Sequence, residues 1–238
     1  MIKINLISHI LIFPVLLFFI FFISRKSIQL LYERLRYVIK HDNPVYIVIS
    51  LLYFPGTVLH ELAHAVMAVS IGLKVRTISL IPSWKTGQLK LGYITYDKKD
   101  VFRGTLVGVA PVFVGIIFLF SMSYFGAFFQ GSIGMNVVHA YTIFVISSTM
   151  FSSRQDMIDG IYVLPAFFIV ISLIMYFIRG SIVSFLGSGF ASQLLEPIFI
   201  KINFYLFITI LIHGMIIGIL STISYLYVSF FRTAKHRR

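Results

Sequence analysis

Long apolar runs dominate this chain and restrict it to a membrane fold. Several of them approach or exceed the roughly 20 residues that a helix needs to cross a bilayer. Of the 238 residues, 58% are hydrophobic and 12% are charged, and a soluble domain carries about twice that charged fraction. We expect an all-α polytopic membrane protein with about six transmembrane helices, forming a single integral membrane domain over residues 1–238.

The predicted spans are separated by short charged, glycine-containing or proline-containing connections. They cover residues 6–23, 46–73, 104–120, 135–151, 161–178 and 202–231. The third span could continue to residue 128. Glycines and a proline interrupt residues 180–201, which we expect at the membrane interface.

Two segments between the first three spans differ in character. Residues 27–40 place Ile28, Leu31 and Leu35 at helical spacing against basic side chains, which predicts an amphipathic helix on the membrane surface. Residues 75–97 alternate β-branched or aromatic residues with polar ones around a Lys-Thr-Gly sequence. This pattern predicts a small β-hairpin, with an irregular loop as the alternative.

A metal-binding motif lies inside the second span, where His60, Glu61 and His64 are the only readily ionised side chains. Residues four apart share one face of a helix, so the imidazoles of His60 and His64 can bind one cation. Glu61 lies beside them and can act on a metal-bound water without being a ligand. Because ionisable groups at membrane depth are costly, this cluster indicates a functional site rather than two hydrogen-bonded core histidines.

A catalytic zinc ion usually has three protein ligands. The chain has no cysteine, so the third ligand must be another histidine or a carboxylate. Asp156 and Asp159 are the first candidates, three residues apart where the fourth span gives way to the fifth, although either one alone could instead cap the next helix. His139, His213 and the hairpin acids are the others, but a lone histidine on an apolar helix is more often packed and hydrogen-bonded than a ligand.

The residues around the motif resemble a known family. The segment FPGTVLHELAHAVMAVSIGLKV is similar to the zinc-binding helix of the site-2 protease superfamily of intramembrane metalloproteases. Ile158-Asp159-Gly160 is similar to the Leu-Asp-Gly in which that superfamily places its third ligand, and the hairpin resembles its membrane-associated β-sheet, whose edge strand pairs with unwound substrate. The resemblance covers residues 46–160.

The chain departs from the family pattern just before this aspartate. The usual Asn-x-x-Pro is replaced by Ser152-Ser153-Arg154-Gln155-Asp156, which resembles a divergent branch of small membrane metallopeptidase-like proteins. We therefore favour Asp156 as the third ligand, with Asp159 second. Gln155 and Ser153 are candidates for stabilising an oxyanion.

The resemblance implies an intramembrane zinc metalloprotease that hydrolyses membrane-embedded or membrane-anchored peptides. Zinc lowers the pKa of its bound water towards about 7, and Glu61 acts as the general base on that water. One alternative is a catalytically idle metal-binding scaffold or regulator, which has no need for Glu61. Another is a transporter, which predicts ionisable groups spread over several spans.

The net charge of +12 comes from basic residues in the loops and the tail. This distribution favours anionic lipid headgroups as partners and gives no folded basic face for nucleic acid. With six spans and a cytoplasmic N-terminus, 13 Lys and Arg residues lie on the cytoplasmic side and 7 on the other, so we expect both termini in the cytoplasm. The short loops favour a prokaryotic cell membrane.

Overall fold

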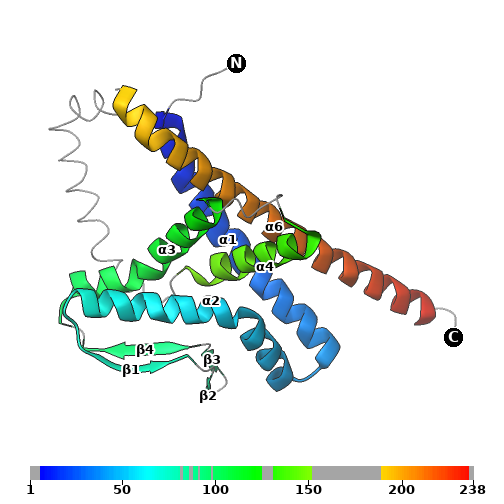
Figure 1. Ribbon diagram of the computed structural model, residues 1–238. Coiled ribbons are helices and arrows are strands. Elements are labelled where there is room, and N and C mark those ends of the chain that lie inside the picture. The colour runs from blue at the N-terminus through cyan, green and yellow to red at the C-terminus, as the bar shows by residue number, and fades with distance from the viewer. Residues whose placement is uncertain are drawn as a thin grey trace.

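The computed structural model shows a mostly helical chain with a small β-structure between its second and third helices (Figure 1). It describes residues 6–80, 83–85, 88–90, 92–97, 99–124, 131–151 and 189–235. The helices within these ranges are α1 (Leu6–Ile39), α2 (Asp42–Ser70), α3 (Val101–Tyr124), α4 (Ile133–Thr149) and α6 (Gly189–Lys235).

Four of these helices, α1, α2, α3 and α6, are long and apolar enough to cross a membrane. Helix α4 is apolar but has only 17 residues. Helices of this length satisfy their own backbone hydrogen bonds, as a bilayer requires, and the prediction of a helical integral membrane protein is confirmed at this level. The sequence predicted about six spans, whereas the described residues contain four, and the predicted span 161–178 lies outside them.

Helix α1 continues past the polar residues at which we expected the first span to end. The hydroxyl of Ser24 donates to the carbonyl of Phe21 at 3.3 Å, and the hydroxyl of Ser27 donates to that of Ser24 at 2.8 Å. Arg25 lies over the ring of Phe21, its guanidinium carbon 4.2 Å from the ring centroid. These contacts satisfy the polar side chains within the helix, so the helix does not end at them. Residues 27–39 form its second half.

The apolar side of this second half packs against protein. Ile28, Leu31 and Leu35 contact a buried cluster on α2 and α4. The cluster consists of Val45, Ile49, Tyr53, Phe144 and Val145. The helical spacing in the sequence indicated an apolar face on this segment, and in the structure α2 and α4 cover that face.

Helix α6 is longer than the predicted last span, 202–231. It begins at Gly189 and passes through Pro197, where we expected an interrupted segment. Proline is tolerated in apolar membrane helices because neighbouring groups and local adjustments satisfy the freed carbonyl. The rings of Phe13 and Phe199 meet edge to face with centroids 6.0 Å apart, so α1 supports this part of α6.

The predicted hairpin is present and consists of two antiparallel strand pairs. The strands are β1 (Val75–Ser79), β2 (Ser83–Lys85), β3 (Gln88–Lys90) and β4 (Tyr93–Tyr96). Strand β1 pairs with β4, and β2 pairs with β3. Val75 and Tyr96 pack on a buried cluster of Ala68, Leu73 and Val107, which joins the hairpin to α2 and α3.

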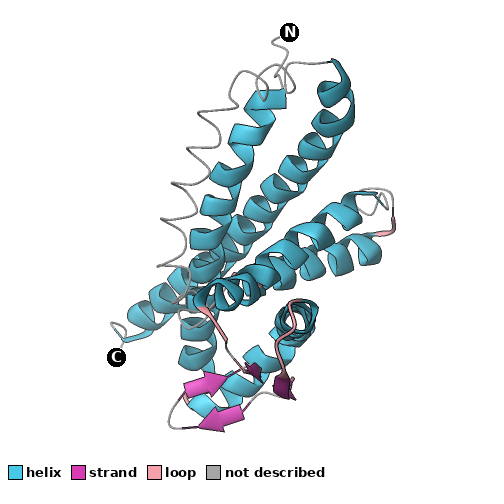
Figure 2. Ribbon diagram, turned by 90° about the vertical axis from the view of Figure 1, so that its left-hand side faces the viewer, coloured by secondary structure: helices cyan, strands magenta, loops and turns pink. Residues whose placement is uncertain are grey.

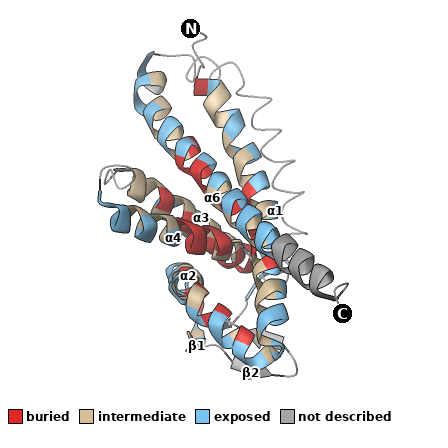
Figure 3. Ribbon diagram, turned by 90° about the vertical axis from the view of Figure 1, so that its right-hand side faces the viewer, coloured by how far each residue is buried: buried red, intermediate tan, exposed pale blue. Residues whose placement is uncertain are grey.

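The helices form two packed groups that share α3 and α4. Helix α1 packs along α6, and α2 packs against α3 and α4 (Figures 1 and 2). The strands lie beyond α2, on the side away from α6 (Figures 1 and 2). Buried positions gather in the middle of the molecule (Figure 3), and the largest cluster comprises Ile20, Leu119, Ile143, Met150, Tyr205, Leu206 and Ile208.

Helix α4 comes very close to its neighbours at two glycines. A Cβ atom on Gly56 of α2 would lie 2.5 Å from the hydroxyl of Thr149, and one on Gly115 of α3 would lie 2.6 Å from Cβ of Met150. Small residues permit this close helix packing in membranes. Gly56 is one turn before the metal-binding motif, so the contact brings the end of α4 to the site.

Candidate metal centre

The motif lies on the face of α2 that packs against the rest of the protein. Glu61 and His64 are buried, with 7% and 3% of their surfaces exposed, and His60 is half-buried. Leu62, between them in sequence, is 42% exposed. The helical period therefore turns the ionisable groups inward and leaves the apolar side chain outside.

The two histidine side chains converge on one point. The Nε2 atoms of His60 and His64 are 3.1 Å apart, and the rings are perpendicular with centroids 4.6 Å apart. Two nitrogens that bind one tetrahedral zinc ion at about 2.05 Å are separated by about 3.3 Å. The pair thus has nearly the separation of two zinc ligands, and it also forms an N–H···N hydrogen bond when His60 carries the proton.

A backbone carbonyl of α3 fixes the orientation of His64. Its Nδ1–H donates to the carbonyl oxygen of Val107 at 2.8 Å. A carbonyl can only accept, so this bond places the proton of the neutral imidazole on Nδ1 and leaves the lone pair of Nε2 directed at His60. Metal-binding histidines are commonly oriented by such an outer bond, and the donor set therefore fits a metal ion.

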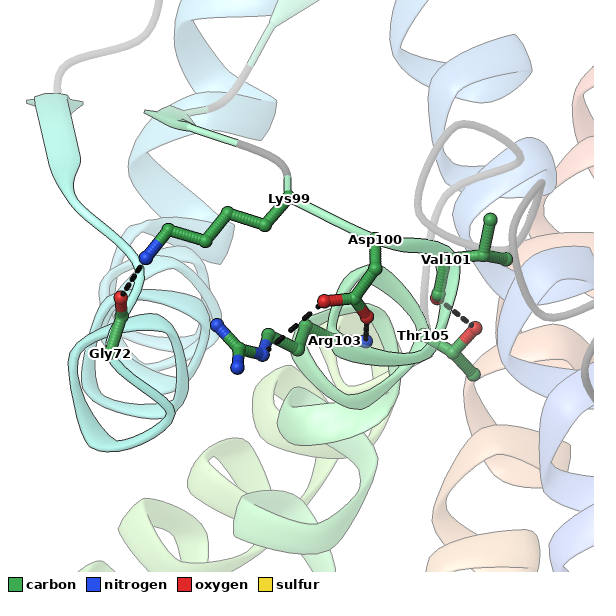
Figure 4. Close-up of polar contacts among 6 residues, drawn as sticks. All are labelled: Gly72, Lys99, Asp100, Val101, Arg103 and Thr105. Atoms are coloured by element: carbon green, nitrogen blue, oxygen red, sulfur yellow. Dashed lines mark hydrogen bonds and ion pairs between the residues drawn. The ribbon is translucent and has the colours of Figure 1, made fainter.

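Polar contacts hold the end of α2 against the start of α3 (Figure 4). The ammonium of Lys99 donates to the carbonyl of Gly72 at 3.2 Å. The carboxylate of Asp100 accepts from the backbone N–H of Arg103 at 2.7 Å and pairs with its guanidinium at 3.3 Å. Asp100 therefore caps α3, and the Lys99 bond joins the start of this helix to the end of α2.

The hairpin covers Glu61. Gly92, just before β4, lies so close that an added Cβ atom would stand 2.8 Å from Cγ of Glu61. It would also meet the carbonyl oxygen of Ser79 and Cγ2 of Thr57, both at 3.1 Å. The end of β1 and the start of β4 thus come close to the motif helix beside the Glu61 side chain.

Among the residues that the structure describes, no three His, Asp or Glu side chains form a group that could hold a metal ion. The first two candidates for the third ligand, Asp156 and Asp159, lie outside the described ranges. In sequence they follow α4, whose last residues lie beside α2. The hydroxyl of Tyr141 donates to the carbonyl of Leu52 at 2.8 Å, and the last residues of α4 meet α2 one turn further on.

His213 lies in a polar contact of its own, apart from the motif. It is fully buried, with Nδ1 2.8 Å from the hydroxyl of Ser27 and Nε2 2.9 Å from that of Ser147. Both ring nitrogens are therefore used in joining α6 to α1 and α4. His139 lies on α4 and is half-buried. His213 has the packed, hydrogen-bonded character expected of a lone histidine in an apolar helix.

Two parts of the site were missed by the sequence analysis. The Val107 carbonyl is a backbone group in an apolar helix and has no side-chain signal, while Gly92 is one of 16 glycines in the chain. Comparison of the chain with protein-family models, with curated proteins and with solved structures found no match.

Proposed function

We propose that this protein is an intramembrane zinc metalloprotease that hydrolyses peptide bonds of membrane-embedded or membrane-anchored substrates. The observation that carries the proposal is the convergence of the His60 and His64 Nε2 atoms at 3.1 Å beside a buried glutamate. A buried cluster of this kind is costly in a membrane segment unless it binds something. A structural histidine pair does not need the carboxylate of Glu61 as well.

In this proposal the residues of the motif have separate roles. His60 and His64 hold zinc, which when bound makes water more acidic and polarises a carbonyl. Glu61 accepts a proton from water and then donates it to the leaving amine. The Gly92 backbone covers Glu61, which limits its contact with bulk water and strengthens its electrostatic interactions.

An aspartate that follows α4 would complete the ligand set. Thr149 lies against Gly56, and His60 is four residues further along α2, about 6 Å along the helix axis. Asp156 follows Thr149 by seven residues, and an extended chain of that length spans up to about 24 Å. Asp156 is within reach of the motif, and the same argument holds for Asp159.

Zinc content tests the proposal directly. We would measure zinc per chain in detergent-purified wild-type protein, Asp156→Ala and Asp159→Ala, with Asp42→Ala as a control for losing an acid. Asp42 pairs with Arg36 at 3.0 Å at the turn between α1 and α2. We expect one zinc in the wild type and the control, and its loss in only one of the other two variants. A wild type that stays metal-free after zinc addition contradicts the proposal.

Peptide cleavage separates the protease from an idle scaffold. Wild-type protein in liposomes would be mixed with a panel of transmembrane peptides carrying a fluorophore and a quencher on either side of the membrane segment. Cleavage by the wild type and its absence in Glu61→Gln support the protease. Zinc binding without cleavage of any peptide in the panel favours the scaffold.

The proposal places the protein in a prokaryotic cell membrane with both termini in the cytoplasm, where its basic loops contact anionic headgroups. Because the chain has no cysteine, a single one introduced at Lys235 reports the side of the C-terminus. In intact cells, we expect an impermeant thiol reagent to label it only after permeabilisation. Labelling of intact cells would indicate that the C-terminus lies outside the cell.

A further inference from the structure

The carbonyl that orients His64 belongs to a special position of α3. In an α-helix, the carbonyl of residue 107 accepts from the N–H of residue 111. Residue 111 is Pro111, inside α3, and proline has no N–H. The Val107 carbonyl therefore lacks its normal helical donor, and the Nδ1–H of His64 occupies it at 2.8 Å.

The proline also directs this carbonyl outward. Its ring clashes with the carbonyl four residues earlier and pushes that group away from the helix axis. A carbonyl displaced in this way can reach a donor on a neighbouring helix. His64 and Val107 lie on adjacent, tightly packed helices, since Ala68 on α2 and Val107 share one buried cluster.

A contact between the end of α2 and the start of α3 sets the register of these two helices. Lys99 binds the carbonyl of Gly72 at 3.2 Å (Figure 4). His64 lies eight residues before Gly72, and Val107 lies eight residues after Lys99. Because the chain runs in opposite directions through α2 and α3, equal steps from this contact bring the His64 and Val107 positions to the same level.

We infer that Pro111 is a positioning residue of the metal site, which frees the Val107 carbonyl to hold His64 in the metal-binding tautomer. The inference rests on the proposed zinc site and adds the group that prepares its buried ligand. It also assigns a role to a proline that, from sequence, was only one of the small or helix-bending residues of the third span.

The test compares Pro111→Ala with Pro197→Ala, which removes a proline from the interior of α6. The zinc dissociation constant would be measured by competition with a chromophoric chelator, and unfolding followed in the same detergent. In Pro111→Ala, the N–H of residue 111 competes for the Val107 carbonyl. Loss of an outer hydrogen bond weakens metal binding by about 10- to 100-fold, and we expect about 10-fold because a carbonyl can accept twice.

Stability distinguishes positioning from damage to the fold. Replacing a helix proline by alanine restores a hydrogen bond and a good helix former, so Pro111→Ala should unfold at the same or a higher temperature while binding zinc more weakly. Parallel losses of stability and affinity would instead indicate damage and overturn the inference.

A spectroscopic readout tests the tautomer without zinc. In metal-free protein with ¹⁵N-labelled histidine, the His64 resonances are assigned by their loss in His64→Gln. We expect the wild type and Pro197→Ala to show His64 protonated on Nδ1, and Pro111→Ala to show a mixture with Nε2. Unchanged tautomer and affinity in Pro111→Ala, with a zinc-binding wild type, overturn this inference alone. A wild type that binds no zinc overturns the proposed function with it.

Discussion

Gly92 lies over Glu61 so closely that a Cβ atom on the glycine would stand 2.8 Å from Cγ of the glutamate. The start of β4 thus lies against the side chain of Glu61, which we propose as the proton acceptor. The part of the hairpin that meets Glu61 is backbone. The same added Cβ atom would also lie 3.1 Å from the carbonyl oxygen of Ser79. The absence of a side chain at residue 92 is therefore what allows the hairpin to meet the motif helix.

Gly92→Ala should destabilise the protein. The new methyl group forces the hairpin or Glu61 to move, and overpacking of this kind costs about 1–3 kcal/mol in the free energy of unfolding. Denaturation in detergent measures it, with Gly218→Ala as the control because a Cβ atom there meets nothing within 4 Å. The control should be neutral or stabilised by up to about 1 kcal/mol. Equal stability of the two variants would show that the close approach does not exist.

Glu61→Gln should abolish cleavage and retain zinc. Glutamine keeps the shape of the buried side chain but cannot accept the proton from water. It also removes a buried carboxylate, so the variant should be at least as stable as the wild type. Zinc per chain and thermal unfolding are the measurements. Loss of zinc from Glu61→Gln would make Glu61 a ligand rather than a base.

The helical character and the hairpin followed from sequence because they depend on local patterns. Apolar runs predict spans, and alternation around Lys-Thr-Gly predicts paired strands. The ends of the helices were harder to predict, because a helix can continue through a polar residue whose side chain is hydrogen-bonded. Ser27 bonds the Ser24 carbonyl and His213, and α1 continues through it.

Half of the candidate site also followed from sequence. The i, i+4 spacing of His60 and His64 determines that they meet on one helix face. The groups that complete the site come from other elements, and no local pattern shows which backbone carbonyl or strand a helix face will meet. The Val107 carbonyl and Gly92 are both of this kind.

Removing the two hydrogen-bond partners of His213 should lower the stability of the fold more than removing His213 itself. In Ser27→Ala/Ser147→Ala, the buried imidazole loses both hydrogen bonds, which costs about 1–3 kcal/mol for each unsatisfied group. In His213→Leu, both hydroxyls can donate to nearby backbone carbonyls, that of Ser24 at 2.8 Å and that of Ile143 at 2.6 Å, so neither is left without a partner.

In detergent, we expect Ser27→Ala/Ser147→Ala to unfold at a lower temperature than His213→Leu. Both variants should keep their zinc. Zinc loss in His213→Leu, with its fold intact, would instead make this histidine the third ligand.

The hairpin should respond to acid through Asp97. The Arg76 guanidinium hydrogen-bonds this carboxylate and, with the charges of Lys74 and Lys99, holds the pKa of Asp97 below its usual range. Because the folded-state pKa is the lower one, the stabilisation is complete above the ordinary value of about 3.9 and is lost as the pH falls through the lowered value. Arg76→Gln should raise the Asp97 pKa, measured by ¹³C NMR titration of its carboxyl carbon, whereas Arg103→Gln, which removes the partner of a different acid, should not. Identical Asp97 titration curves in the wild type and Arg76→Gln would show that the two side chains do not pair in solution.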